Sequence, residues 1–138
     1  MKLCYFEAAK QCSYLSDYHG ASSVKVGAVA IFKRSVIAKG FNQNKTHPLQ
    51  KKYNVYRYKF QSSHYYPCKI HAEMEVISKI RRLDINFSDV EIYVYREFKD
   101  STLAMARPCA ACVKAMKDLG IRKICYTTPD GYCEERFN

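Results

Sequence analysis

Two short sequences in the chain contain the residue types that bind a metal ion and move protons. The first is His71-Ala72-Glu73, and the second is Pro108-Cys109-Ala110-Ala111-Cys112. Cys109 and Cys112 are three positions apart, so on the first turn of a helix both sulfur atoms can face one ion. A helix N-terminus lowers the pKa of a thiol and so favours the thiolate that zinc requires. His71 would add a nitrogen ligand from the start of a second helix.

These residues have the composition of a catalytic zinc site. One imidazole and two thiolates are three protein ligands, which leaves the fourth position of a tetrahedral zinc ion for water. Zinc lowers the pKa of such a water molecule to about 7. Glu73 points away from the ligand direction at helical spacing, so it can transfer protons instead of binding the metal. We therefore predict His71, Cys109 and Cys112 as zinc ligands, and Glu73 as the catalytic acid and base.

A structural zinc site is the alternative to a catalytic one. Cys68-Lys69-Ile70-His71 is a C-x-x-H sequence, so Cys68 could complete a set of four ligands. Such a site holds no activated water and only clamps the chain together. It gives no role to Glu73. A redox pair without metal is a further alternative, although the sequence around Cys109 lacks the thioredoxin pattern.

The spacing of apolar residues predicts the elements that position these side chains. Three segments with apolar residues at three- and four-residue steps are expected to be helices: Lys2–Tyr18, His71–Leu83 and Pro108–Leu119. Five short apolar runs are expected to be strands: Val24–Phe32, Ser35–Phe41, Val90–Tyr95, Ile121–Thr127 and Tyr132–Phe137. The polar and aromatic stretch Asn42–Lys69 reads as a long loop.

The order of these elements predicts the fold class. Residues 1–138 have the length of one domain. Lys33-Arg34 between the first two strands suggests an antiparallel hairpin, and the turn residues Pro129-Asp130-Gly131 suggest another at the C-terminal end. We expect an α/β fold with three layers, α/β/α, around a mixed five-stranded sheet that can end in an antiparallel hairpin.

Together, H-x-E and P-C-x-x-C at the starts of two predicted helices form the signature of zinc-dependent base deaminases. On these motifs the chain resembles the cytidine deaminase-like superfamily, which includes cytidine, deoxycytidylate, polynucleotide and toxin deaminases. The resemblance runs from the first predicted helix to Gly120. It implies hydrolysis of cytosine to uracil, with adenine as the other possible base. It also implies that Asn42 or Asn44 contacts a sugar, and that the backbone around Arg107 meets the exocyclic amine.

The net charge of +10 is concentrated in one segment. Between Tyr18 and Ala72 there are ten Lys and Arg residues and no Asp or Glu, and the other 13 basic residues equal the 13 acidic ones. Residues 43–69 interleave cations with tyrosines, as surfaces that bind single strands do. A solvated loop whose tyrosines pack on the core is the alternative. The substrate contacts that we predict here are Lys51, Lys52, Arg57, Tyr56 and Tyr58.

The concentrated charge favours a large substrate over a small one. A cytosine in single-stranded DNA or RNA would use the basic segment for its phosphates. A free nucleotide such as dCMP, or cytidine, needs only one or two cations and is the alternative. A zinc-clamped module that binds nucleic acid without catalysis is the alternative from another functional class.

The sequence also suggests where the protein works. Its seven cysteines are an odd number, which does not suit a fully paired disulfide framework, so we expect a cytoplasmic protein. No apolar run approaches the roughly 20 residues that span a bilayer, and the N-terminus lacks the pattern of a secretory signal. We therefore expect no membrane partner.

Overall fold

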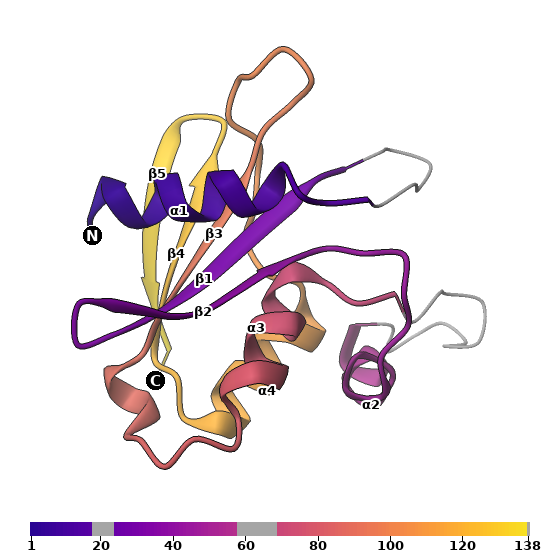
Figure 1. The fold of residues 1–138 in the computed structure, drawn as a ribbon, viewed down its shortest axis with the longest axis vertical. Coiled ribbons are helices and arrows are strands. Elements are labelled where there is room, and N and C mark those ends of the chain that lie inside the picture. The colour runs from indigo at the N-terminus through magenta and orange to yellow at the C-terminus, as the bar shows by residue number, and fades with distance from the viewer. Residues whose placement is uncertain (18–23, 58–68, 138) are drawn as a thin grey trace.

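Figure 1 shows a sheet with helices on both faces, in a computed structural model that describes residues 1–17, 24–57 and 69–137. The strands are β1 (Val26–Phe32), β2 (Ser35–Phe41), β3 (Glu91–Arg96), β4 (Lys123–Thr128) and β5 (Gly131–Arg136). The helices are α1 (Leu3–Ser13), α2 (Pro48–Arg57), α3 (Ala72–Ile80), α4 (Ala110–Leu119) and a short 3-10 helix, η2 (Phe87–Asp89). The predicted three-layer α/β fold is confirmed.

The five strands lie in the order β2-β1-β3-β4-β5. β1 is antiparallel to both β2 and β3, β3 is parallel to β4, and β4 is antiparallel to β5. Both predicted hairpins are therefore present, and the sheet is mixed. The parallel pair requires a crossover connection, and α4 provides it. Pro108–Cys112 lies in this crossover, between β3 and β4.

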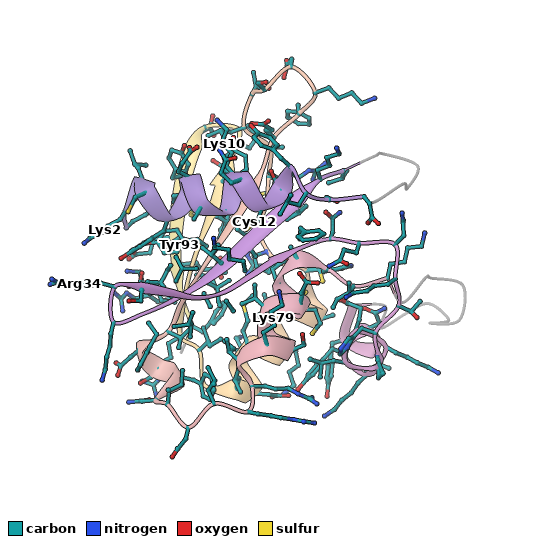
Figure 2. The ribbon with its side chains drawn as sticks, viewed as in Figure 1. Lys2, Lys10, Cys12, Arg34, Lys79 and Tyr93 are labelled. Carbon is teal, nitrogen blue, oxygen red and sulfur yellow. The ribbon has the colours of Figure 1, made fainter. Side chains whose placement is uncertain are left out.

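The two faces of the sheet form two separate cores, because alternate residues of a strand point to opposite faces. On β3, Ile92 and Val94 belong to the larger core, which also contains residues of α3 and α4. Tyr93 of the same strand points to the opposite face and packs with Phe6 and Cys12 of α1. Figure 2 labels Cys12 and Tyr93 between α1 and the sheet. The helices that bear the predicted site thus lie on one face only.

Two glycines allow the helices to approach the sheet closely. A Cβ atom at Gly40 of β2 would lie 2.6 Å from the carbonyl oxygen of Ala72, at the start of α3. A Cβ atom at Gly27 of β1 would clash with the carbonyl oxygen of Ala9 in α1. Any larger side chain at Gly40 would push away the helix that follows His71.

The predicted loop over Asn42–Lys69 is wrong for residues 48–57, which form α2. Pro48 occupies the first position of this helix, where a missing N–H costs nothing. Its buried stripe consists of Leu49, Gln50, Tyr53 and Asn54. Two of these four residues are amides, so the segment reads as polar although its spacing is helical. Residues 58–68 of the predicted loop lie outside the described residues.

Helices α1 and α3 are shorter than predicted. α1 ends at Ser13 and α3 ends at Ile80. Leu15 and Leu83, the apolar residues that extended the two predicted helices, are both exposed. The helical spacing of apolar residues therefore continues beyond the part of each helix that packs against the sheet. None of the helices within the described ranges is long and apolar enough to cross a membrane.

Candidate metal centre

Helices α3 and α4 begin side by side, and the residues at their starts bring three potential ligands together. His71 is the N-cap residue of α3, Cys109 is the N-cap residue of α4, and Cys112 lies in the first turn of α4. The Nδ1 atom of His71 is 3.5 Å from the Sγ atom of Cys109 and 3.6 Å from that of Cys112. All three ligand atoms lie within 4.8 Å of one another.

These separations fit a zinc ion. In a tetrahedral site with the usual Zn–N and Zn–S bond lengths, a nitrogen and a sulfur ligand are about 3.6 Å apart. Both nitrogen–sulfur distances agree with that value. One imidazole with two thiolates is also a donor set that zinc prefers. The residues therefore suit zinc in both geometry and chemistry.

The environment of Cys109 favours the thiolate that binds metal. A hydrogen bond from the Cys112 thiol lowers the pKa of Cys109 to about 3, and His71 acts in the same direction against the opposing effect of burial. A thiol with such a low pKa is ionised at neutral pH. The site can therefore accept a cation without first displacing a proton from Cys109.

Glu73 lies on the first turn of α3, directly beside the ligands. Its side chain is 6% exposed, and burial raises the pKa of its carboxyl group. The Cys112 sulfur is within its hydrogen-bonding reach. A carboxyl group whose pKa is moved towards neutrality can both accept and donate a proton at working pH. The structure thus places a buried carboxyl group beside the three potential ligands.

Glu75 is not among the site residues predicted from the sequence, although it is buried two residues further along α3. Its carboxylate accepts hydrogen bonds from the backbone N–H of Phe41, at 3.3 Å, and from the side-chain amide of Gln43. The Nζ atoms of Lys79 and Lys45 lie 3.6 and 3.8 Å away, and Figure 2 labels Lys79 on α3. Glu75 thereby joins the segment after β2 to the helix that carries Glu73. Only the i,i+4 pair with Lys79 could be read from the sequence.

The three residues that the resemblance implied for substrate binding all have protein partners. The Asn42 side chain accepts from the Val26 N–H at 2.9 Å and donates to the Val24 carbonyl at 2.7 Å. The Asn44 side chain donates to the Asp17 carbonyl at 2.6 Å. The guanidinium group of Arg107 makes two hydrogen bonds to Glu135, at 2.8 and 2.9 Å. Their contacts with a substrate stay a prediction.

The predicted basic contacts lie on α2, which adjoins the ligand centre. Lys51 and Lys52 are exposed, and Tyr56 is 40% exposed. Lys114 of α4, which the sequence did not indicate, places its Nζ atom 5.5 Å from the centre of the Tyr56 ring. The buried face of α2 reaches the ligands through Gln50, which contacts the backbone of His71. The Arg57 side chain, Tyr58 and Cys68 lie outside the described part of the chain.

Comparisons with known proteins agree with this geometry. The family model described as the cytidine and deoxycytidylate deaminase zinc-binding region matches residues 4–128. The structure of cytidine deaminase from Burkholderia pseudomallei is similar with a TM-score of 0.66 and 19% identity, over 99% of this chain and 92% of that chain. The dCMP deaminase of the cyanophage S-TIM5 gives a TM-score of 0.59 and 22% identity, over 91% of this chain and 84% of that chain.

The same phage enzyme in complex with dCMP and dUMP gives a TM-score of 0.60 and 19% identity, over 91% of this chain and 82% of that chain. At these identities the likeness to solved structures shows the fold. No curated protein sequence matches this chain closely enough to count as a relative.

Proposed function

Since this chain belongs to the cytidine and deoxycytidylate deaminase family, whose members are zinc-dependent hydrolases, we propose that it converts cytosine to uracil by hydrolysis at C4. The match to residues 4–128 confirms the family resemblance predicted from the two motifs. One observation carries the proposal: the ligand atoms of His71, Cys109 and Cys112 lie within 4.8 Å of one another beside the buried Glu73.

In the proposed reaction each site residue has a distinct task. His71, Cys109 and Cys112 hold the zinc ion, which when bound supplies a Lewis acid that lowers the pKa of water to about 7. Glu73 accepts a proton from the attacking water, protonates the ring nitrogen N3, and then protonates the amino group that leaves as ammonia. Water thus supplies the oxygen of the product; one of its protons remains on N3 of the uracil, and the other leaves with the ammonia. The raised pKa of Glu73 suits this double use.

We further propose that the cytosine is presented in a single-stranded nucleic acid. The exposed Lys51 and Lys52 offer charge for phosphates, and the exposed ring of Tyr56 offers a surface for stacking. Lys114 from α4 adds a further cation beside that ring. The proposal includes Arg57 and Tyr58 as further contacts with the strand. In it, Asn42 or Asn44 contacts the sugar, and the backbone around Arg107 meets the amine.

A free nucleotide is the second candidate substrate. The similar cyanophage structure holds dCMP and dUMP, which supports dCMP as an alternative. Adenine remains the alternative base, because its deaminases use the same ligand set. The free nucleotide and the polynucleotide can be separated by one set of assays, since each product that contains uracil differs in mass from its substrate.

The experiment is incubation of the zinc-loaded protein with dCMP, with cytidine and with a cytosine-containing single-stranded oligonucleotide, followed by detection of uracil. We expect product from the oligonucleotide, with a rate that falls steeply as salt is added. Absence of uracil from all three substrates would overturn the proposed activity. Product from dCMP or cytidine alone would overturn the polynucleotide substrate.

Charge reversal tests whether α2 binds the strand. The double variant K51E/K52E should lower the oligonucleotide rate at least tenfold and leave the dCMP rate nearly unchanged. The matched control is K2E/K10E, which makes the same change of charge at Lys2, the N-cap residue of α1, and at Lys10 within that helix. Figure 2 labels both lysines, on the opposite side of the sheet. An equal loss in both double variants would contradict a specific role for α2.

A structural clamp without catalysis makes different predictions. If Cys68 were a fourth zinc ligand, Cys68→Ala would release zinc, and the oligonucleotide would bind without forming uracil. The catalytic proposal expects zinc to stay bound in Cys68→Ala, as measured by metal content after gel filtration.

We also propose that the protein works in the cytoplasm. The six described cysteines are free thiols. Free thiols, including the pair that binds zinc in the proposal, persist in a reducing compartment.

A further inference from the structure

Helix α2 buries two amide side chains next to the metal centre. Gln50 is 0% exposed and Asn54 is 2% exposed. The Gln50 Nε2 atom donates to the Oδ1 atom of Asn54 at 2.8 Å, and the Gln50 Oε1 atom accepts from the backbone N–H of His71 at 3.0 Å. Burying an amide costs about 1–3 kcal/mol unless its hydrogen bonds are satisfied. An apolar residue would pack at position 50 without that cost, so the amide points to its contact with His71.

The backbone N–H of His71 donates a hydrogen bond to Gln50. His71 is the extended N-cap residue of α3, and its carbonyl already accepts the N–H of Glu75 at 3.0 Å. An N-cap N–H lies outside the helix and has no partner within it. Gln50 supplies that partner from a different helix. The main chain at His71 is therefore held by α3 on one side and by α2 on the other.

The direction of the His71 side chain follows from this backbone. Its Nδ1 atom faces the sulfur atoms of Cys109 and Cys112 at 3.5 and 3.6 Å, at the separation that a shared zinc ion requires. The two cysteines lie at the start of α4, so they do not hold the backbone of His71 in place. A shift of the main chain before Ala72 would move Nδ1 away from both sulfur atoms.

We propose that Gln50 is a positioning residue of the zinc centre: its side-chain oxygen fixes the backbone of His71 so that Nδ1 meets the two thiolates, and Asn54 holds the Gln50 amide in that orientation. This inference deepens the proposed function, and any effect of Gln50 on turnover rests on that function. The effect of Gln50 on metal binding can be measured without a substrate. Lys51 and Lys52 follow Gln50 directly in α2, so the same helix carries the proposed substrate contacts and the residue that holds the backbone of His71.

The test compares zinc affinity, by chelator competition, and the absorption spectrum of the cobalt-substituted protein. Gln50→Met keeps the length of the side chain and removes the acceptor; we expect zinc affinity to fall about 10- to 100-fold, as for other residues that orient metal ligands, with altered cobalt bands. Gln50→Glu keeps an acceptor oxygen and should bind zinc within about threefold of the original chain, a conservative rescue. Leu49→Met is the matched control, since Leu49 is a buried neighbour in α2.

The outcomes separate a positioning role from a merely structural one. A lowered melting temperature of zinc-free Gln50→Met, with unchanged zinc affinity and cobalt spectrum, would overturn the proposal, and so would equal losses in Gln50→Met and Leu49→Met. If Gln50→Met does not fold, Asn54→Leu replaces it, because this variant keeps the Gln50 oxygen and loosens its orientation. A two- to threefold weaker zinc affinity is then expected, and an unaltered affinity and cobalt spectrum would overturn the proposal. Absence of uracil product would overturn the proposed activity and leave these metal measurements standing.

Discussion

The two sides of helix α3 place two carboxylates of nearly equal burial in opposite surroundings. Glu73, 6% exposed, faces the ligand centre, where burial raises the pKa of its carboxyl group. Glu75, 5% exposed, faces the segment after β2 and meets two ammonium groups, a backbone N–H and the Gln43 amide. Exposure alone therefore does not decide what a buried carboxylate does; its partners do.

The different surroundings of Glu73 and Glu75 suit the two carboxylates to different roles. A carboxylate surrounded by cations and donors is stable as an anion and is a poor proton donor. The contacts of Glu75 thus hold the segment after β2 against α3. Glu73 is only partly compensated, by His71, its own backbone and Cys112, so burial still raises the pKa of its carboxyl group and its ionised form costs stability. The comparison predicts that the same substitution has different effects at the two positions.

The largest effect is expected on turnover in Glu73→Gln. Glutamine keeps the shape of the side chain and cannot accept or donate the proton, so cytosine deamination should fall about 10²- to 10⁴-fold. Zinc content should stay unchanged, because His71, Cys109 and Cys112 are intact. The measurements are the rate of uracil formation and the zinc content of the purified variant. Turnover within tenfold of the original chain would contradict the role of Glu73.

The next effect is a loss of stability in Glu75→Gln. The neutral side chain gives up its attraction to Lys45 and Lys79, whose side chains are 60% and 52% exposed, so solvent screens much of each pair. Charge-assisted hydrogen bonds to a buried carboxylate are lost as well, and together we expect a loss of about 1–2 kcal/mol in the free energy of unfolding. Urea denaturation of the zinc-free protein measures it. An unchanged free energy of unfolding, with a loss of turnover as large as in Glu73→Gln, would contradict the structural role of Glu75 and indicate a catalytic role instead.

A gain in stability is expected for Glu73→Gln in the zinc-free chain. Burial raises the folded-state pKa of Glu73, so the protonated form favours the fold. This contribution is complete below the ordinary pKa of about 4.3 and is lost as the pH rises through the raised value. At pH 7 an unfolded chain has an ionised carboxylate that burial disfavours, so Glu73 costs stability there, and glutamine removes that cost. The melting temperature of Glu73→Gln should exceed that of the original chain at pH 7, by a margin that shrinks towards pH 4.

This contrast also marks how far the sequence could predict the site. The ligand set and Glu73 follow from local spacing at the starts of two helices, and β2 lies over the predicted Ser35–Phe41. The partners of Glu75 could not be read in this way, because Phe41 and Gln43 lie 34 and 32 positions away and meet it only after β2 packs on α3. Gln50 is likewise 21 positions from His71. Its helix was missed because the buried stripe is half amide, and hydrophobic spacing does not detect buried amides.

The smallest effects are expected from the two lysines around Glu75, and they show which contact holds the segment after β2. Lys79→Met removes an i,i+4 pair and the 2.6 Å hydrogen bond from Nζ to the carbonyl of Lys39. Lys45→Met removes the longer pair with Glu75, at 3.8 Å, which is the one side-chain ion pair of Lys45 with the described residues. After allowance for solvent screening, each loss should lie between about 0.2 and 1 kcal/mol, and the loss at Lys79 should be the larger.

Repeating both substitutions in Glu75→Gln isolates the ion pairs. In that background Lys45→Met should not change the free energy of unfolding, because the charge that Lys45 pairs with is gone. Lys79→Met should still lower it, but only by the contribution of the hydrogen bond to the Lys39 carbonyl. The readout is the coupling free energy from urea denaturation of the single and double variants. An undiminished loss for Lys45→Met in that background would show that Lys45 stabilises the chain by some other contact, and the charge compensation assigned to this side of α3 would then rest on Lys79 alone.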